Sequence, residues 1–120
     1  MTLGNQLVDM EFIRRPDGLT QVTLSGRLDT PGVDRIESRF LAAVAAEGKN
    51  AIVDVSRVAF IGSMGIRMLI TAARSMGHRH ARLALFGAQS MVHEVFENVS
   101  LREMIPIVDT EAEAITAVAS

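Results

Sequence analysis

The N-terminal part of the chain alternates between apolar and polar residues with the period of a β-strand. Val8, Met10 and Phe12 are apolar, and the residues between them are acidic. A second alternating stretch covers residues 20–28, after the turn sequence Pro-Asp-Gly at 16–18. Alternation indicates a strand with one buried face, and proline and glycine favour a tight turn. We therefore expect a β-hairpin at the start of the fold.

Beyond residue 30 the apolar residues recur every three or four positions, as on one face of an α-helix. The first predicted helix has Thr30 as its N-cap and Pro31 as its first residue, and it ends before Gly48. A second predicted helix runs from Ser63 to about Gly77. Its core-facing residues are expected to be Ile66, Leu69, Ile70 and Ala73.

Two further helices and several strands complete the predicted order. Ser90 is expected to cap a third helix, and Thr110 with Glu113 forms a capping box for a C-terminal one. Apolar runs predict buried strands, with a tight loop between the first two; the runs cover residues 51–55, 58–61, 83–86 and 105–108. Strands that alternate with helices indicate an α/β fold around a parallel or mixed sheet. We expect residues 1–120 to form one domain.

Composition excludes several classes of protein. The chain has no cysteine, which rules out disulfides, thiolate metal sites and a cysteine nucleophile. It has no tryptophan or tyrosine, so we expect no base-stacking surface and no direct contact with nucleic acid. No apolar run is long enough to span a bilayer, so no membrane insertion is expected. Residues 1–10 lack the features of a secretory signal, and a cytoplasmic location is expected.

Charge is unevenly distributed along the chain. The net charge is −2, yet no acidic residue lies between Asp54 and Glu94. That stretch contains Arg57, Arg67, Arg74, Arg79 and Arg82. The favoured interpretation is a surface on which the charges mix after folding. The alternative is a basic face for an acidic or phosphorylated partner.

The residue pattern argues against an enzyme. Ser63 lies at a strand-to-helix turn, but a nucleophile elbow requires glycine two residues earlier, where this chain has Ile61. No histidine is placed to serve as its base. His78 and His80 have no cysteine or acidic neighbour to complete a metal site. No phosphate-binding or dinucleotide-binding fingerprint is present, so no catalytic residue, metal or cofactor is predicted.

Two interpretations of Ser63 remain open on the residues alone. Its hydroxyl can act as the N-cap of the following helix. It can equally be a phosphorylation site, because a helix N-terminus favours negative charge and a phosphate adds a charge of about −2.

A surface is predicted on the helix after Ser63. On a helical wheel Met64 and Met68 point away from Ile66 and Ile70, together with Thr71 and Ser75. Two methionines one turn apart are suited to an adaptable contact surface. The alternative is that another element of the fold covers this face.

Residues 54–66, with the sequence DVSRVAFIGSMGI, resemble the signature of the STAS domain, and specifically of bacterial anti-sigma factor antagonists. Residues 26–29, with the sequence GRLD, resemble the G-x-L-D step of that family. The resemblance covers nearly the whole chain. It implies a STAS fold, with a mixed sheet of four to five strands and helices packed on one side.

The resemblance also implies a function. In partner switching, the unphosphorylated antagonist binds an anti-sigma factor, usually a serine kinase of the histidine-kinase-like ATPase fold, and so releases a sigma factor. The kinase phosphorylates the serine that matches Ser63, and a phosphatase resets the cycle. The residues expected to contact the partner are Asp29, Thr30, Gly62, Ser63, Met64, Arg67 and Met68. The alternatives are a STAS adaptor without phosphorylation, in a lipid- or anion-transport complex, and a small-ligand or nucleotide sensor.

The chain departs from the family pattern at two positions. Gly62 stands where many phosphorylated members have an acidic residue, and Met64 stands where they have a hydroxyl. These changes bear on kinase recognition more than on the identity of the acceptor serine.

Overall fold

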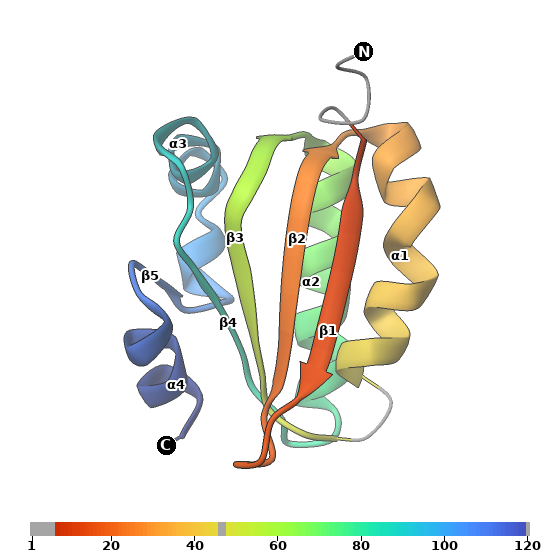
Figure 1. The fold of residues 1–120 in the computed structure, drawn as a ribbon. Coiled ribbons are helices and arrows are strands. Elements are labelled where there is room, and N and C mark those ends of the chain that lie inside the picture. The colour runs from red at the N-terminus through yellow and green to blue at the C-terminus, as the bar shows by residue number, and fades with distance from the viewer. Residues whose placement is uncertain (1–6, 46–47, 120) are drawn as a thin grey trace.

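The computed structural model describes residues 7–45 and 48–119, which form a five-stranded sheet and four α-helices (Figure 1). The strands lie in chain order across the sheet: β1 (Asp9–Arg14), β2 (Thr20–Leu28), β3 (Ala51–Ile61), β4 (Leu83–Phe86) and β5 (Ile107–Val108). The helices are α1 (Thr30–Ala45), α2 (Ser63–Gly77), α3 (Ser90–Asn98) and α4 (Glu111–Ala119). A short 3-10 helix, Leu101–Glu103, precedes β5. Residues 1–6, part of the segment expected to lack a secretory signal, lie outside the described residues.

The predicted hairpin and the α/β class are confirmed. β1 pairs antiparallel with β2, and the other neighbouring strands are parallel, so the sheet is mixed. Gly18 closes the hairpin turn with a φ of +91°, a conformation that favours glycine.

β3 is one continuous strand, so the tight loop expected between residues 55 and 58 is wrong. The pairing between β2 and β3 instead shifts register twice, and each shift leaves one extra residue in β3. At the first shift the Asp54 carboxylate accepts a hydrogen bond of 2.8 Å from the Ser56 N–H. These bulges keep the strands paired until Leu28 lies opposite Ile61, so β2 and β3 end side by side.

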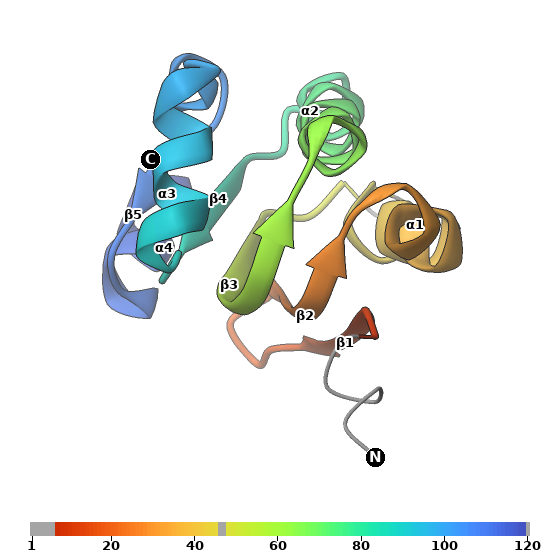
Figure 2. The same ribbon diagram turned by 90° about the horizontal axis from the view of Figure 1, so that it is seen from above.

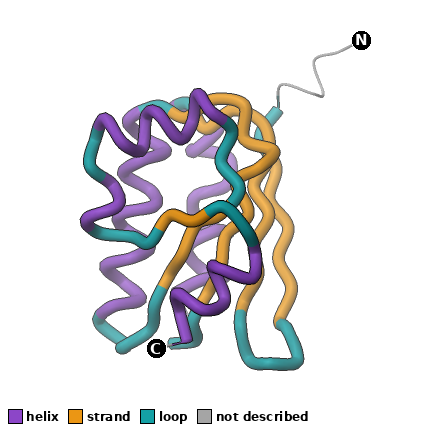
Figure 3. The backbone as a smooth tube through the Cα atoms, turned by 90° about the vertical axis from the view of Figure 1, so that its left-hand side faces the viewer, coloured by secondary structure: helices purple, strands orange, loops and turns teal. Residues whose placement is uncertain are grey.

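The two faces of the sheet are covered differently. The main apolar core lies between the sheet and α1, α2 and α3, in agreement with the helices expected on one side. Crossovers of one hand that advance in one direction along a sheet place their helices on the same face, and Figure 2 shows α1 and α2 side by side above the strands. α4 differs: its Ala114 and Val118 pack on Ile52, Ala84 and Phe86, which point to the opposite face. Figure 3 shows this helix leading from β5 to the C-terminal end.

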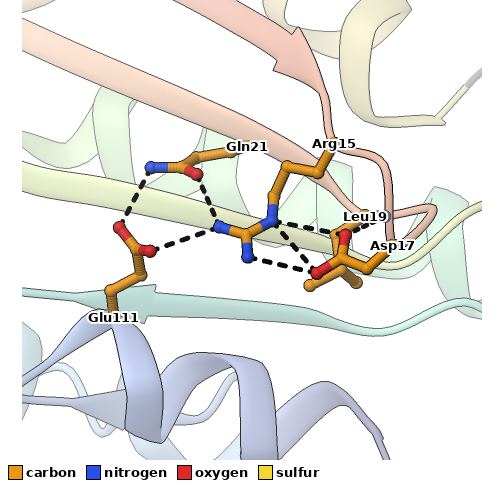
Figure 4. Close-up of polar contacts among 5 residues, drawn as sticks. All are labelled: Arg15, Asp17, Leu19, Gln21 and Glu111. Atoms are coloured by element: carbon orange, nitrogen blue, oxygen red, sulfur yellow. Dashed lines mark hydrogen bonds and ion pairs between the residues drawn. The ribbon is translucent and has the colours of Figure 1, made fainter.

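A polar cluster joins the β1–β2 turn to the start of α4 (Figure 4). Arg15 Nη1 donates to Glu111 Oε2 over 3.2 Å and to Gln21 Oε1 over 2.9 Å. Arg15 also pairs with Asp17 over 3.1 Å. The hydrogen bond from Arg15 is the largest cause that holds the pKa of Asp17 below its ordinary value. The cluster therefore connects the first hairpin to the last helix.

Of the two caps predicted for α3 and α4, one is confirmed. The capping box of α4 is present: Thr110 Oγ1 accepts the Glu113 N–H over 3.2 Å, and the Glu113 carboxylate accepts the Thr110 N–H over 3.1 Å. Ser90 is not a cap, because α3 has Gln89 in that position and Ser90 is its first residue.

Candidate functional site

The predicted site residues gather where β2 and β3 end and where α1 and α2 begin, at the top of Figure 1. The Gly62 N–H donates a hydrogen bond of 3.0 Å to the Leu28 carbonyl. This bond ties together the two chain segments from which the helices start. The carboxyl ends of the parallel strands thus bring residues 29–30 next to residues 62–67.

Asp29 is the N-cap of α1, a role that was expected of Thr30. Its carbonyl accepts the Val33 N–H over 2.8 Å, and its Oδ1 accepts the Gly32 N–H over 2.9 Å. Thr30 is the exposed first residue of the helix, so its predicted capping role is wrong. The Gly32 hydrogen bond is the largest cause that lowers the pKa of Asp29; partial desolvation opposes it, and Arg27 lowers it further.

Two glycines let the helices approach the end of β2. A Cβ atom on Gly32 would lie 2.1 Å from the Arg27 carbonyl oxygen. A Cβ atom on Gly65 would lie 2.7 Å from Ile61 Cγ1 and 3.0 Å from Leu28 Cβ. Side chains at either position would push a helix away from the sheet, so both glycines fix the geometry of the site.

Ser63 is the first residue of α2, so the first of its two open interpretations, the N-cap, is wrong. The cap position belongs to Gly62, whose φ of −108° and ψ of −172° are extended. The strand ends at Ile61, as expected, and the single residue between it and α2, Gly62, takes the cap position. The Ser63 side chain is exposed, and its hydroxyl has no hydrogen-bond partner among residues 7–45 and 48–119.

Met68 does not lie on the predicted contact surface. Its side chain is 0% exposed and belongs to the main core, so the expectation that it contacts a partner is wrong. The helical wheel assumes that α2 is buried only on the side that faces the sheet, whereas α1 also lies beside this helix. This wider buried face includes Met68 and Leu69, and Met64 is partly buried against the same core.

The exposed face of α2 carries cations. Ser63 and Arg67 are both exposed and lie one helical turn apart on the same face. Arg74 is exposed further along that face. Within the part of the chain that the structure describes, neither arginine has an acidic partner.

Six of the seven predicted partner-binding positions therefore lie at least partly at the surface around the two helix starts. Asp29 and Thr30 come from α1, and Gly62, Ser63, Met64 and Arg67 come from α2 and its cap.

Arg27 and Phe60 belong to the same region, although the residue pattern predicts neither as a site residue. They are paired across β2 and β3. The Arg27 guanidinium lies over the Phe60 ring, 4.4 Å from its centroid, and Arg27 Nε donates to Asp29 Oδ2 over 3.3 Å. The apolar run 58–61 predicts that Phe60 is buried, because the bulges of β3 disturb the alternation that would place it on the surface.

The structure places the histidines away from these helix starts. His78 and His80 are exposed after α2, and His93 on α3 lies 3.9 Å from Glu97. Among the described residues, no three histidine, aspartate or glutamate side chains are grouped to hold a metal ion. In the same residues, no helix combines the length and apolar character needed to cross a bilayer.

The sequence matches the STAS domain family over residues 12–114. An anti-sigma-B factor antagonist of Listeria monocytogenes is 23% identical over 106 residues, which cover 88% of this chain and 93% of that protein. The structure of an anti-sigma-factor antagonist (STAS) domain protein from Planctomyces limnophilus matches with a TM-score of 0.80 and 25% identity, over 93% of this chain and 99% of that one.

The anti-sigma factor antagonist SpoIIAA shares the fold in two forms. Its unphosphorylated form matches with a TM-score of 0.74 and 23% identity, over 92% of this chain and 96% of that one. Its phosphorylated form, from Bacillus, matches with a TM-score of 0.64 over 92% of this chain and 99% of that one.

Proposed function

The chain belongs to the STAS domain family, and from this premise we propose that it is an anti-sigma factor antagonist controlled by phosphorylation of Ser63. In its unphosphorylated form it binds an anti-sigma factor and so releases a sigma factor. The anti-sigma factor is also the serine kinase, of the histidine-kinase-like ATPase fold, and a phosphatase acting on Ser63 restores binding. The chain supplies no catalytic residue, contacts no nucleic acid directly and acts in the cytoplasm.

The position of Ser63 is the observation that carries this proposal. Its side chain is exposed on the first turn of α2 and makes no hydrogen bond within the described residues. A kinase can therefore reach the hydroxyl without unfolding any part of the domain. SpoIIAA, which shares the fold, has been solved with and without a phosphate.

Phosphorylation at this position is compatible with the fold and disruptive to an interface. The first N–H groups of α2 and the helix dipole favour a phosphate on Ser63. A partner surface fitted to a hydroxyl must desolvate about two negative charges instead. The modification therefore acts on binding and leaves the domain folded.

The first experiment is a pull-down from the native cell with the unmodified chain, followed by mass spectrometry of the bound protein. The identified anti-sigma factor is then purified and incubated with ATP and either the wild-type chain or Ser63→Ala. We expect one phosphate on the wild type, mapped to Ser63, and none on the variant. The unmodified chain should bind the anti-sigma factor and the phosphorylated chain should not.

Ser90 offers a matched control for this experiment. Like Ser63, it is the exposed first residue of a helix whose N-cap makes no side-chain hydrogen bond. Ser90→Ala should be phosphorylated as the wild type is, and Ser90→Glu should bind as tightly as the wild type. If no phosphate is found on Ser63 and Ser63→Glu still binds fully, the switch is excluded and a constitutive STAS adaptor replaces it.

A further inference from the structure

The Arg27 guanidinium is held in place from two sides. Its Cζ atom lies over the Phe60 ring, 4.4 Å from the centroid, and its Nε donates to the Asp29 carboxylate over 3.3 Å. Asp29 is itself held by the Gly32 N–H, so the Arg27–Asp29 pair is anchored to the backbone of α1. Stacking on an aromatic ring and pairing through Nε both restrict the arginine to one rotamer.

The outer edge of the same guanidinium remains available. Within the described residues, Nη1 and Nη2 have no hydrogen-bond partner, and 41% of the Arg27 side chain is exposed. Both Asp29 oxygens are already used, one by Gly32 and one by Arg27. The site therefore presents two unpaired N–H₂ groups in a fixed orientation and no unpaired carboxylate.

A groove of mixed character adjoins Arg27. It is lined by apolar Leu7, Val8 and Pro31 and by the charged residues Arg27, Asp29 and Arg35. Arg35 is exposed and has no acidic partner among the described residues. The lining has two arginines and one aspartate, so the groove has a net positive charge beside an apolar wall.

We propose that this groove binds an acidic residue of the anti-sigma factor, whose carboxylate pairs with Nη1 and Nη2 of Arg27 while its neighbouring apolar side chain lies on Leu7 and Pro31. Arginine forks match carboxylates with two parallel hydrogen bonds. Because Phe60 and Asp29 already order the side chain, binding loses little of its rotamer freedom. Arg35 supplies a second, longer-range attraction. This inference rests on the proposed function and identifies the chemistry of the partner at one point.

The test is calorimetric titration of the purified anti-sigma factor with wild-type chain, Arg27→Gln, Arg27→Lys and Arg35→Gln, at low and high salt. Arg27→Gln should weaken binding by about tenfold or more, as expected for a central arginine of an interface. Arg27→Lys should weaken it nearly as much, because lysine keeps the charge but has neither the fork nor the stacking plane. Arg35→Gln should reduce the salt dependence with a smaller loss of affinity.

Arg74→Gln is the matched control, since it removes the same charge from an exposed position on α2. It should bind within about twofold of the wild type. Thermal melting of each variant verifies folding, and if Arg27→Gln fails to fold, Arg35→Gln and Arg27→Lys decide the outcome.

The failures of the two proposals are distinguishable. If the wild type binds the anti-sigma factor and Arg27→Gln and Arg35→Gln bind equally well, the acidic contact is wrong and the proposed function stands. If Arg27→Lys alone binds like the wild type, the paired hydrogen bonds are wrong. If the wild type binds no anti-sigma factor at all, both proposals fail together.

Discussion

The backbone N–H of Gly62 donates to the carbonyl oxygen of Leu28 over 3.0 Å. Leu28 is the last residue of β2, and Gly62 is the cap of α2. One hydrogen bond between backbone atoms thus sets the distance between the α1 start, which carries Asp29, and the α2 start, which carries Ser63. Since no side chain takes part, substitutions at the surface leave this spacing intact.

Ser63→Ala should change the free energy of unfolding by less than about 0.5 kcal/mol, because Ser63 is exposed and caps nothing. Thr110→Ala is the comparison: Thr110 is a hydrogen-bonded cap, and its loss should cost about 1 kcal/mol. Urea unfolding of both variants measures the difference. A loss at Ser63 as large as that at Thr110 would mean that its hydroxyl caps the helix in solution.

Asp29→Ala should destabilise the domain by about 1 kcal/mol, because it removes the α1 cap. It should also weaken binding of the anti-sigma factor, because Arg27 loses the carboxylate that orients it. Thr30→Ala is the control for stability, with an expected change below about 0.5 kcal/mol. Thermal melting and titration calorimetry separate the two effects, and a variant that is destabilised but binds normally would limit Asp29 to the cap.

Met68→Ala should cost about 2–5 kcal/mol, since the side chain is 0% exposed and its removal leaves a cavity in the main core. Met91→Ala on α3 makes the same chemical change at a side chain that is 71% exposed, and it should cost less than about 0.5 kcal/mol. Chemical denaturation of the two variants provides the measurement. Equal stabilities would show that Met68 lies on the surface.

Gly65→Ala should destabilise the domain by more than about 1 kcal/mol, because its Cβ would lie 2.7 Å from Ile61 Cγ1. Gly77→Ala in the same helix meets nothing within 4 Å and should stabilise it by up to about 1 kcal/mol. The two melting temperatures should therefore move in opposite directions. A Gly65→Ala protein as stable as the wild type would contradict the close approach of α2 to β2.

Acid should weaken the β1–β2 turn through Asp17. The pKa of Asp17 is lowered in the folded state, mainly by the hydrogen bond from Arg15. A lowered folded pKa gives stability that is present above the unfolded pKa of about 3.9 and is lost as the pH falls through the folded value. Asp17→Asn should therefore lose less stability than the wild type between pH 7 and pH 3, measured by urea unfolding. Asp34→Asn, at an exposed α1 residue, should follow the wild type.

Elements with a clear period could be predicted from the sequence, and single-residue boundaries could not. The hairpin, the strand Leu83–Phe86 and the capping box of Thr110 with Glu113 agree with the structure. Each depends on residues close together in the chain. The caps expected at Thr30 and Ser63 are each displaced by one residue, because a single residue, Asp29 or Gly62, separates each strand from the following helix and takes the cap position.

The errors at the candidate site have a common physical origin in tertiary contacts. Met68 was placed on the surface because a helical wheel of α2 contains no information about α1, which covers a second side of that helix. Phe60 was placed in the core because an apolar run does not reveal the bulges of β3. The contact between Arg27 and the Phe60 ring could not be predicted, because it depends on the register between β2 and β3.

The two bulges of β3 also fix the rotation of the helix that follows. Each successive residue of an α-helix is turned by about 100° around its axis. Loss or gain of one residue in β3, with the register at the start of the strand kept, would bring a different residue opposite Leu28 and therefore a different side chain to the outward position that Ser63 now occupies. Substitutions between Asp54 and Ile61 leave the rotation of α2 unchanged, whereas insertions and deletions alter it. The length of β3, as much as the identity of the serine, therefore determines which residue is exposed on the first turn of α2.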